Sequence, residues 1–265
     1  MAYEHGMYQY LKVTPAGGSA ISVPITSSGM KFSSEVGRVS AVGSRKPYLL
    51  YPGEIKYSGS FEAIVIPGIL DVLKLIYTEG TLGFLKTFSV DDGNTLLSDC
   101  KMSSLKLSLA LGKPVTAAFD FLAQGKDTGT TGESVDVSVA FVPNNITLSG
   151  IADFDCDAID ISISNDLKEK YGMKGTDSRK PKVITEGEQK ITVDVKYLEN
   201  PGIDVDDIAV IETGSIAIKG TDGTSTFTIS LTKLLAGGLD KDTKIDDIIR
   251  FGVSYQAKEV TFAIA

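Results

Sequence analysis

Few side chains in this sequence could act as catalysts, and their placement argues against an enzyme. The only histidine among the 265 residues is His5, close to the N-terminus. Catalytic triads, Cys-His pairs and multi-histidine metal sites all need a well-placed histidine, so these sites are nearly excluded. The two cysteines, Cys100 and Cys156, are too few for a disulfide framework and lack the neighbours of a zinc site. We expect both to be small, buried, apolar side chains.

Carboxylates are the remaining candidates for chemistry. Asp153, Asp155 and Asp157 could in principle transfer protons or hold a cation, but they alternate with Phe154 and Cys156 as one polar face of a strand would. The segment also lacks the glycine and the distal glutamate of a calcium loop. A second acidic cluster between residues 240 and 247 is typical of a charged turn. No glycine loop of the kind that cradles phosphates precedes a helix. We therefore expect no catalytic, cofactor or metal site.

The length and charge of the chain limit the number of domains and the kinds of partner that it can have. A chain of 265 residues is long enough for two domains of ordinary size. The net charge is −8, and the excess of acidic residues lies entirely after Glu133. This balance does not support a basic groove for nucleic acid. Acidity could serve solubility alone, or it could form walls that DNA passes without sticking. No apolar run is long enough to span a bilayer and the N-terminus lacks the order of a signal peptide, so we expect no membrane insertion or export.

An internal repeat organises the chain. A shift of 134 residues lays residues 30–80 on residues 164–214 and gives 12 identities in 51 positions, where unrelated sequences would give roughly 3. The identities form blocks: Ser44-Arg45-Lys46-Pro47 with Ser178-Arg179-Lys180-Pro181, Gly53-Glu54 with Gly187-Glu188, and Pro67-Gly68-Ile69 with Pro201-Gly202-Ile203. The repeat predicts two copies of one fold, residues 1–133 and 134–265. Residues 125–132 between them have the composition of a flexible connection.

Apolar and polar residues alternate with a period of two through both halves, which predicts antiparallel sheets. In the first half the alternation runs through residues 55–65 and 105–111, and Gly112-Lys113-Pro114 predicts a hairpin with residues 115–123. In the second half it runs through residues 191–197, 215–219 and 226–231. We predict a further hairpin formed by Arg250–Gln256 and Lys258–Ala265. The expected fold is mainly β, two tandem β-sandwich or barrel domains that each carry a short helix.

The helix of the first half is indicated by Pro67 in a first helical turn and by apolar residues at helical spacing up to Tyr77, with Gly80 ending the run. In the second half, residues 205–211 could form a shorter helix. Two charged segments, residues 33–51 and 165–185, alternate too irregularly for buried strands, and we expect long loops there. Such loops commonly carry function or interfaces. The shared Ser-Arg-Lys-Pro block could make one contact twice per chain, or mark a turn that needs its proline.

The order of these motifs resembles the tail tube proteins of long-tailed, siphovirus-type phages, in the form that carries the fold twice. The resemblance covers nearly the whole chain through short, degenerate motifs. In the first half these are Gly17-Gly18-Ser19, the strand at residues 21–26, Gly59-Ser60-Phe61, the helix after Pro67, and the runs 87–90, 97–108 and 112–116; in the second half it is the run 159–167.

The resemblance implies a structural virion protein and no enzyme. Its sheets would line stacked rings that form the hollow tail tube through which the viral genome passes. Because single-copy members form hexameric rings, a duplicated chain implies a homotrimeric, pseudo-hexameric ring. The implied partners are further copies of the chain, the tape measure, terminator and baseplate proteins, and double-stranded DNA in transit. The implied location is the virion tail, assembled in the host cytoplasm, and no cofactor is implied.

Two sets of residues are candidates for these roles. The alternation allows a face toward the lumen, or equally toward outer solvent, made of Lys56, Ser58, Ser60, Thr192, Asp194 and Lys196. The long loops would bridge ring to ring through Arg45, Lys46, Pro47, Tyr48, Arg179, Lys180 and Pro181, with Asp204, Asp206 and Asp207 as acidic partners. Two other functions fit the sequence: a distal tail, baseplate or adaptor ring of the same particle, and a carbohydrate- or protein-binding β-sandwich module. The lack of tryptophan counts against a sugar-binding platform.

Overall fold

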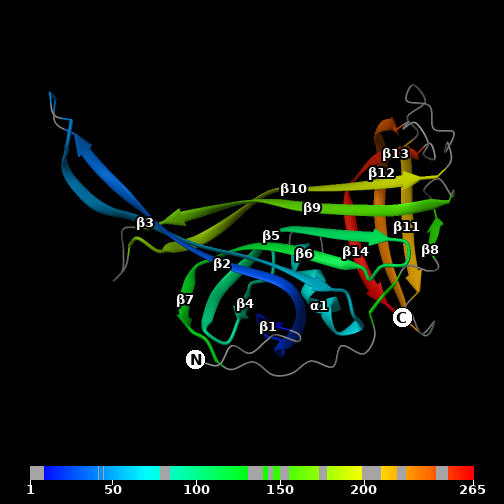
Figure 1. Cartoon of the computed structure of the whole chain (residues 1–265), viewed down its shortest axis with the longest axis horizontal. Helices are drawn as coiled ribbons and strands as arrows, with labels where there is room; N and C mark the ends of the chain where they lie inside the picture. The colour runs from blue at the N-terminus through cyan, green and yellow to red at the C-terminus, as the bar shows by residue number, and fades with distance from the viewer. Residues whose placement is uncertain are drawn as a thin grey trace.

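The computed structural model describes residues 9–40, 42–43, 45–77, 84–130, 140–142, 146–149, 155–172, 178–198, 210–219, 225–242 and 250–265. Antiparallel strands make up most of this part of the chain (Figure 1). The strands are β1 (Gln9–Pro15), β2 (Ile21–Ser40), β3 (Pro47–Ile64), β4 (Phe88–Asp91), β5 (Thr95–Ala110), β6 (Thr116–Ala123), β7 (Gly125–Thr128), β8 (Ile146–Ser149), β9 (Cys156–Tyr171), β10 (Pro181–Tyr197), β11 (Val210–Lys219), β12 (Thr226–Asp242), β13 (Arg250–Ala257) and β14 (Glu259–Ile264).

The first half closes into a six-stranded barrel. Its strands follow the order β4-β1-β2-β3-β6-β5, and β4 also pairs with β5, so the sheet returns to its own beginning. Closure satisfies the backbone groups that an open sheet would leave at its edges. The interior is filled by alternate residues of these strands, among them Val13, Val23, Phe61, Phe119 and Leu105.

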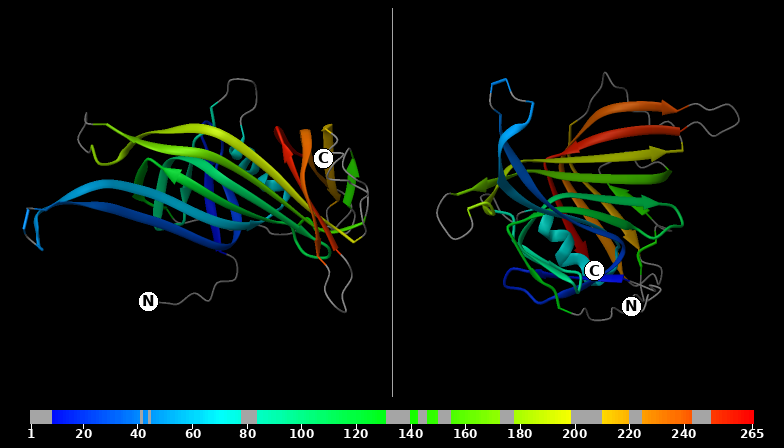
Figure 2. Two further views of the ribbon diagram at one scale, coloured as in Figure 1. Left: turned by 90° about the horizontal axis from the view of Figure 1, so that it is seen from above. Right: turned by 60° about the vertical axis from the view of Figure 1, so that its left-hand side comes forward.

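The predicted helix is confirmed, although it is short. It consists of a 3-10 turn at Pro67–Ile69, α1 at Leu70–Leu73 and a second 3-10 turn at Lys74–Ile76. Ile69, Leu73 and Ile76 are buried, so its apolar stripe faces the core. The turns lie among the strands of the first half (Figure 2, right). Gly80 lies outside the described residues. No helix in the described part of the chain is long and apolar enough to cross a membrane.

The second half continues the same sheet. Its strands follow the order β9-β10-β13-β12-β11-β8, and β14 pairs with β12. No pairing between β8 and β9 joins the two ends of this order within the described ranges. One hydrophobic core runs through both halves, with contacts such as Tyr77 against Phe262, whose ring centroids are 5.7 Å apart.

One predicted hairpin is confirmed and one is wrong. β5 and β6 pair across the turn that contains Gly112, whose φ of 70° suits glycine. Residues 250–257 and 259–264 do form strands, but β13 and β14 do not pair with each other. Both lie along one edge of β12, β13 on its second part and β14 on its first. The chain therefore bends at Lys258 and continues along the same neighbour, because its apolar residues alternate on both sides of that position with no turn between them.

The expected long loops at residues 33–51 and 165–185 are wrong for residues 33–40, 47–51, 165–171 and 181–185, which are strands. β2 and β3 pair as far as Ser40 and Pro47, and β9 and β10 as far as Tyr171 and Pro181. Residues 31–56 form a hairpin that we call arm 1, and residues 165–189 form arm 2; both project from the same side of the body (Figures 1 and 2). Arm 1 is exposed on both faces, so it lacks the alternation by which buried strands are recognised.

Two further predictions are affected by the structure. In the expected flexible connection, residues 125–128 form β7 and pair with β5, so that prediction is wrong for this part. Residues 205–209 of the possible second helix lie outside the described residues, whereas Val210 and Ile211 begin strand β11. The propensity of a polar, glycine-containing stretch to be flexible is overridden here by strand pairing.

Asp91 explains how the chain is held after β7. Its carboxylate accepts hydrogen bonds from the Thr130 amide (2.9 Å), the Thr130 hydroxyl (2.7 Å) and the Gly93 amide (2.8 Å). Burial alone would raise the pKa of Asp91, but these donors outweigh it and the pKa is lowered. Gly129 lies so close that a Cβ there would be 2.5 Å from Asp91 Oδ1. Asp91 therefore clamps the end of the first half.

The strand pairings of the two halves correspond at the shift of 134 residues. β6 pairs with β3 from Tyr57↔Ala123 onward, and β13 pairs with β10 from Ile191↔Ala257 onward. β7 on β5 and β14 on β12 agree in the same way. Two non-glycine residues in the described part have positive φ, Asp99 at 51° and Lys233 at 52°, and they too are 134 positions apart.

The arms also correspond, with one difference. Bulges interrupt β3 between Pro52 and Ile55 and β10 between Glu186 and Gln189, again 134 positions apart. On the partner strands the equivalent positions are 131 apart, such as Ser34 and Asn165. The difference of three arises because the connection between β9 and β10 is three residues longer than the connection between β2 and β3. Glu35 therefore corresponds by pairing to Asp166 and not to Glu169, with which the ungapped sequence comparison matched it.

We predict that Asp91→Asn destabilises the protein by roughly 1–3 kcal/mol, because a charged acceptor of three hydrogen bonds becomes neutral. A lowered folded-state pKa stabilises the fold above the ordinary value of 3.8, and this contribution is lost as the pH falls through the folded-state pKa. Urea unfolding should therefore show the cost at pH 7 and little of it at pH 2. Asp127→Asn, on the exposed strand β7, is the control. Equal effects of the two changes would contradict the clamp.

Candidate functional site

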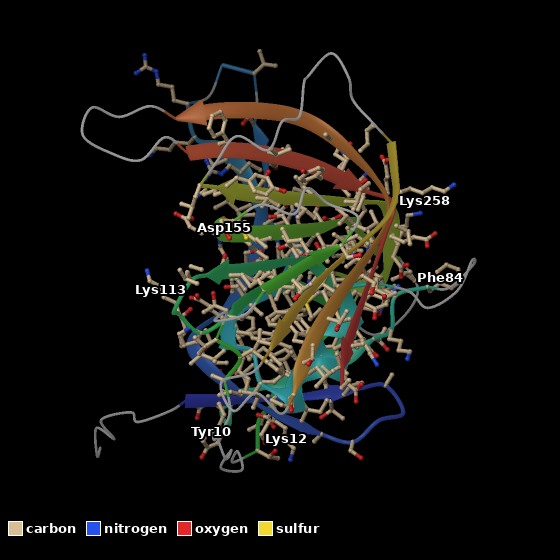
Figure 3. All side chains as sticks on the ribbon, turned by 90° about the vertical axis from the view of Figure 1, so that its right-hand side faces the viewer. Tyr10, Lys12, Phe84, Lys113, Asp155 and Lys258 are labelled. Atoms are coloured by element: carbon tan, nitrogen blue, oxygen red, sulfur yellow. The ribbon has the colours of Figure 1, made fainter. Side chains whose placement is uncertain are left out.

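The two halves meet along a pair of strands. Residues 104–110 of β5 pair with residues 158–164 of β9, for example Leu105 with Ile163 and Leu107 with Ile161. These four side chains are buried. The junction makes β3, β6, β5, β9, β10 and β13 neighbours in one sheet, which we call the central sheet. The β5–β6 turn with Lys113 and the start of β9 with Asp155 lie on the same side of the molecule (Figure 3). The Leu111 amide donates to the Asp157 carbonyl oxygen there, at 3.1 Å.

One face of the central sheet is polar across both halves. Rows of directly paired residues cross the junction without interruption, one of them Glu62, Ala118, Lys106, Ser162, Thr192 and Gln256. The face is internally bonded: the Ser104 hydroxyl donates to Asp120 and the Ser108 hydroxyl to Asp160, both at 2.6 Å. Hydroxyls and carboxylates therefore cover a surface that is continuous between the halves.

Most of the predicted lumen residues lie on this face. Ser58 and Ser60 lie on β3, and Thr192, Asp194 and Lys196 lie on β10, each between buried neighbours. Lys56 is engaged at the base of arm 1, where its Nζ lies 2.8 Å from Glu35 Oε1. This ion pair raises the pKa of Lys56. The structure thus brings five of the six together on one face.

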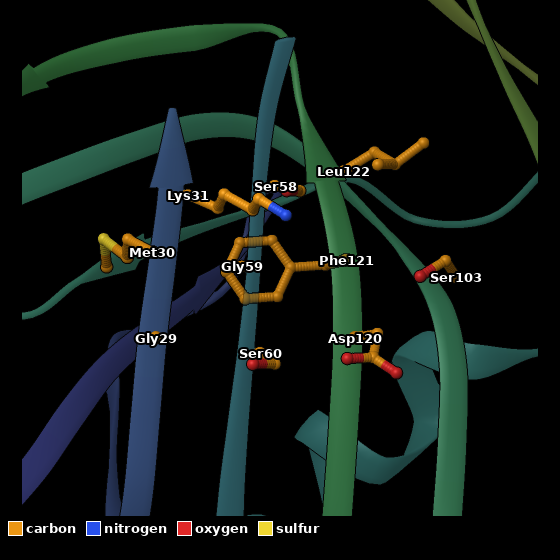
Figure 4. A pocket seen from close by; sticks show the side chains of 10 residues that line it. All are labelled: Gly29, Met30, Lys31, Ser58, Gly59, Ser60, Ser103, Asp120, Phe121 and Leu122. Carbon is orange, nitrogen blue, oxygen red and sulfur yellow. The ribbon is translucent and has the colours of Figure 1, made fainter. Parts of the chain in front are cut away.

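A hollow opens on this face beside β2 (Figure 4). It is lined by Gly29 and Lys31 of β2, Ser58 and Ser60 of β3 and Asp120 of β6, among others. The ring of Phe121 lies against Gly59, where a Cβ would come within 2.4 Å of the ring, so only glycine fits. The hollow ends at the edge of β2. Residues 27–33 of that strand pair with β3 on one side and with no described strand on the other.

Arm 2 is fastened to the first half by a largely buried ion pair. Lys101 of β5 binds Glu186 of β10, and their side chains are 13% and 16% exposed. Lys101 Nζ also donates to the Ile184 carbonyl oxygen at 3.1 Å, and Glu186 Oε2 accepts from the Leu85 amide at 3.0 Å. Ile184 itself is 1% exposed. The sequence analysis missed both charges, because 85 positions separate them and neither belongs to a motif.

A second polar contact ties the helical turns to the same arm. The side-chain amides of Asn165 and Gln189 both donate to the Ile76 carbonyl oxygen, each at 2.9 Å. Gln189 also donates to Asn165 Oδ1, and Asn165 donates to the Met102 carbonyl oxygen. The last carbonyl of the turns is thus satisfied by the second half, as buried helix ends require.

The second Ser-Arg-Lys-Pro block contacts the first half, whereas the first block is exposed. The Ile55 amide of β3 donates to the Arg179 carbonyl oxygen at 2.8 Å, and Pro181 is buried. Arg45, Lys46 and Pro47 are exposed, and Tyr48 is 82% exposed. Lys180 is partly buried. The proposed acidic partners Asp204, Asp206 and Asp207 lie outside the described residues.

An acidic group lies beside the contact of the second block. The Tyr171 hydroxyl is 3.0 Å from Glu169 Oε2 and 3.2 Å from the Ile55 carbonyl oxygen, and Glu169 Oε1 is buried without a described hydrogen-bond partner. Burial raises the pKa of Glu169, as does nearby Glu54, while Tyr171 and Lys56 act in the opposite direction. Burial and the same carboxylate raise the pKa of Tyr171.

The candidate residues for chemistry do not form a site in the described part of the chain. His5 and Asp153 lie outside it, and Asp155 is exposed. No cluster of three metal-ligating side chains is found within the described ranges. Cys100 is buried, as expected, and burial raises the pKa of its thiol. Cys156 is only partly buried, so the expectation is wrong for that residue.

Comparison with known proteins agrees with the resemblance noted from the sequence. A family model described as phage tail tube protein matches residues 13–257, which includes both halves and the junction. A search of curated proteins finds no match.

We predict that Glu186→Gln costs roughly 3 kcal/mol of stability, because it leaves the Lys101 ammonium largely buried beside a neutral partner. The double change Lys101→Met with Glu186→Leu should recover most of that loss, since no unpaired charge remains. Urea unfolding measures both. Lys56→Met is the control, because the Lys56–Glu35 pair is exposed and screened by solvent, so its loss should change the stability much less than Glu186→Gln does. A double variant less stable than the single one would contradict this account.

Proposed function

Because the chain belongs to the phage tail tube protein family, we propose that it assembles into stacked rings that form a hollow tail tube for passage of the viral genome. The family match over residues 13–257 is the observation that carries this proposal. On this proposal the protein is a structural component of the virion tail. It assembles in the host cytoplasm, and its partners are other copies of the chain and the tape measure, terminator and baseplate proteins.

We propose that each chain supplies two equivalent modules, residues 1–133 and 134–265, and that three chains make a pseudo-sixfold ring. The support is the agreement of strand registers, bulges and positive-φ residues at a shift of 134. A further argument is that the β5–β9 junction joins the halves into one sheet, and the same kind of junction could join one chain to the next. Repeating one junction around an axis closes a ring and leaves no free edge.

The polar face of the central sheet is proposed to line the lumen. It carries hydroxyls together with both charges: Asp120, Asp160 and Asp194 are interspersed with Lys106 and Lys196. Such a mixed face offers the phosphates of passing DNA no continuous basic surface to bind. The buried, apolar face of the sheet contacts the core and cannot face a water-filled channel. Serine and threonine side chains are short, so they leave the channel wide.

The tips of the arms are proposed to reach the neighbouring ring. Arm 1 extends well beyond the body of the chain (Figure 1), and Arg45, Lys46 and Tyr48 near its tip are exposed. Exposed ion pairs contribute only about 0–1 kcal/mol each, so the apolar part of Tyr48 and its neighbours must provide most of the contact. The exposed side chain of Arg179 and the partly buried Lys180 would join this contact from arm 2, whereas Pro181 is buried within the chain.

Electron microscopy of the purified protein tests the proposal. We predict hollow tubes built of stacked rings, each ring with three chains and six similar lobes, and with arm tips at the ring boundaries. Long tubes support a tail tube protein, whereas isolated rings would indicate an adaptor or distal tail ring. Monomers at every concentration, with or without the other tail proteins, would contradict the proposal.

A change of lumen charge tests the proposed orientation. We predict that Ser60→Arg with Asp194→Arg gives tubes of unchanged diameter that retain double-stranded DNA at low salt and release it as salt rises. Arginines that neutralise phosphates release condensed counterions, and the gain from this release shrinks as the salt concentration increases. Filter retention of labelled DNA by purified tubes measures this. Ser19→Arg, in the exposed turn between β1 and β2, is the matched control. DNA retention equal to that of the wild type would contradict the proposal that this face lines the lumen.

A further inference from the structure

The junction inside the chain uses one edge of β5 and one edge of β9, and the equivalent edges of β12 and β2 have no partner among the described strands. Inside the chain, residues 104–110 of β5 pair with residues 158–164 of β9. By the registers described above, the equivalents in the described part of the chain are residues 238–242 of β12 and residues 27–33 of β2. On the relevant side, neither residues 238–242 nor residues 27–33 pair with another described strand.

We propose that the junction is repeated between chains: the β12 edge of one chain pairs with the β2 edge of a second copy, and arm 1 of that copy docks on the first as arm 2 docks within the chain. This inference rests on the proposed self-assembly and specifies its contact surface. The partner is a second copy of this chain.

The register follows from the internal junction. Lys106 lies opposite Ser162 within the chain, so Asp240 of one copy lies opposite Lys31 of the next. Leu105 lies opposite Ile163, so Leu239 lies opposite Phe32. The residue types at these positions, an acid opposite a base and two apolar residues opposite each other, favour this register over a slipped one.

Exposure supports the docking of arm 1. Phe32 is 42% exposed, whereas its equivalent in the internal junction, Ile163, is 1% exposed; Leu50 is 57% exposed, whereas its equivalent Ile184 is 1% exposed. The two arms differ in exposure at the side chains that arm 2 buries against the first half. The neighbouring Leu49 and its equivalent Val183 are about equally exposed, at 52% and 50%. Arm 1 thus presents apolar side chains at the positions that arm 2 buries.

The receiving surface is apolar where the internal one is ionic. Lys101, which holds arm 2, corresponds to Leu235, and Leu235 is 42% exposed. Its partner Glu186 corresponds to Pro52. The ion pair is therefore replaced by an apolar contact in which Leu235 lies next to Leu50 and Pro52 of the second copy.

This replacement also provides specificity. If arm 1 docked on the first half, Lys101 would be buried without its carboxylate, and if arm 2 docked on the second half, Glu186 would lose its ammonium. Either error leaves a buried, unpaired charge. The contact is head-to-tail, since the two edges differ, and such contacts close into rings when the rotation permits.

Engineered disulfides test the register, in a Cys156→Ser background. Directly opposed residues of antiparallel strands have Cα atoms about 4.5–5.5 Å apart, which suits a disulfide. Lys31→Cys with Asp240→Cys should give chains linked to one another under mild oxidation. Lys106→Cys with Ser162→Cys is the positive control and should give a disulfide within one chain. Lys31→Cys with Asp242→Cys is the register control and should link chains at least tenfold less.

A charge graft tests the docking of arm 1. Leu235→Lys should lower the yield of assembled rings at least tenfold without unfolding the chain, and adding Pro52→Glu should restore most of it by rebuilding the internal ion pair between chains. Leu111→Lys, at another exposed leucine, should have no effect.

The outcomes separate this inference from the proposed function. If the wild type forms tubes but the Lys31–Asp240 cysteine pair links no chains, or Pro52→Glu fails to rescue Leu235→Lys, the inference is overturned and the tube stands. If the wild type does not assemble under any condition, the proposed function and this inference both fail. Linked chains together with the rescue establish the contact.

Discussion

The pairing of β5 with β9 is the interaction on which the rest of this structure depends. Each strand carries a row of backbone amides and carbonyls that must be satisfied, and here the two rows satisfy each other across the halves. The pairing aligns the buried leucines and isoleucines on one face and the serines and carboxylates on the other. A slip of one residue would exchange the two faces, so the apolar core fixes the register. The core and the polar face are therefore consequences of one junction.

The arms follow from the same junction but differ in what they bury. Arm 2 is held by the Lys101–Glu186 ion pair, by Ile184 and by the amides of Asn165 and Gln189. Arm 1 has a bulge at the equivalent position but leaves Phe32 and Leu50 exposed. Exposed apolar side chains on an isolated hairpin are costly in water, and they are expected where a partner is missing. In the proposed ring, the second copy supplies it.

The sequence predicted the helix and those strands whose apolar residues alternate, because both depend on local periodicity. The lumen candidates on β3 and β10 share a face for the same reason. The arms were mistaken for loops since their residues are exposed on both sides, and no alternation marks such a strand. The connection at residues 125–128 was mistaken for a linker because its order comes from pairing with β5 and from Asp91, far away in the sequence. Lys101 and Glu186 carry no local signal at all. Long-range pairs of this kind are decided by packing, which periodicity does not encode.

The central claim, that the sheet continues from one chain into the next, is tested most directly by hydrogen exchange before and after assembly. The account predicts fast exchange in the monomer for the alternate backbone amides of residues 27–33 and 238–242 that point away from β3 and β13, and protection of these amides in the assembled protein. Amides of residues 104–108 should be protected in both states, because this part of β5 pairs with β9 on one edge and with β6 on the other. Assembly without a gain of protection at residues 27–33 would contradict the claim.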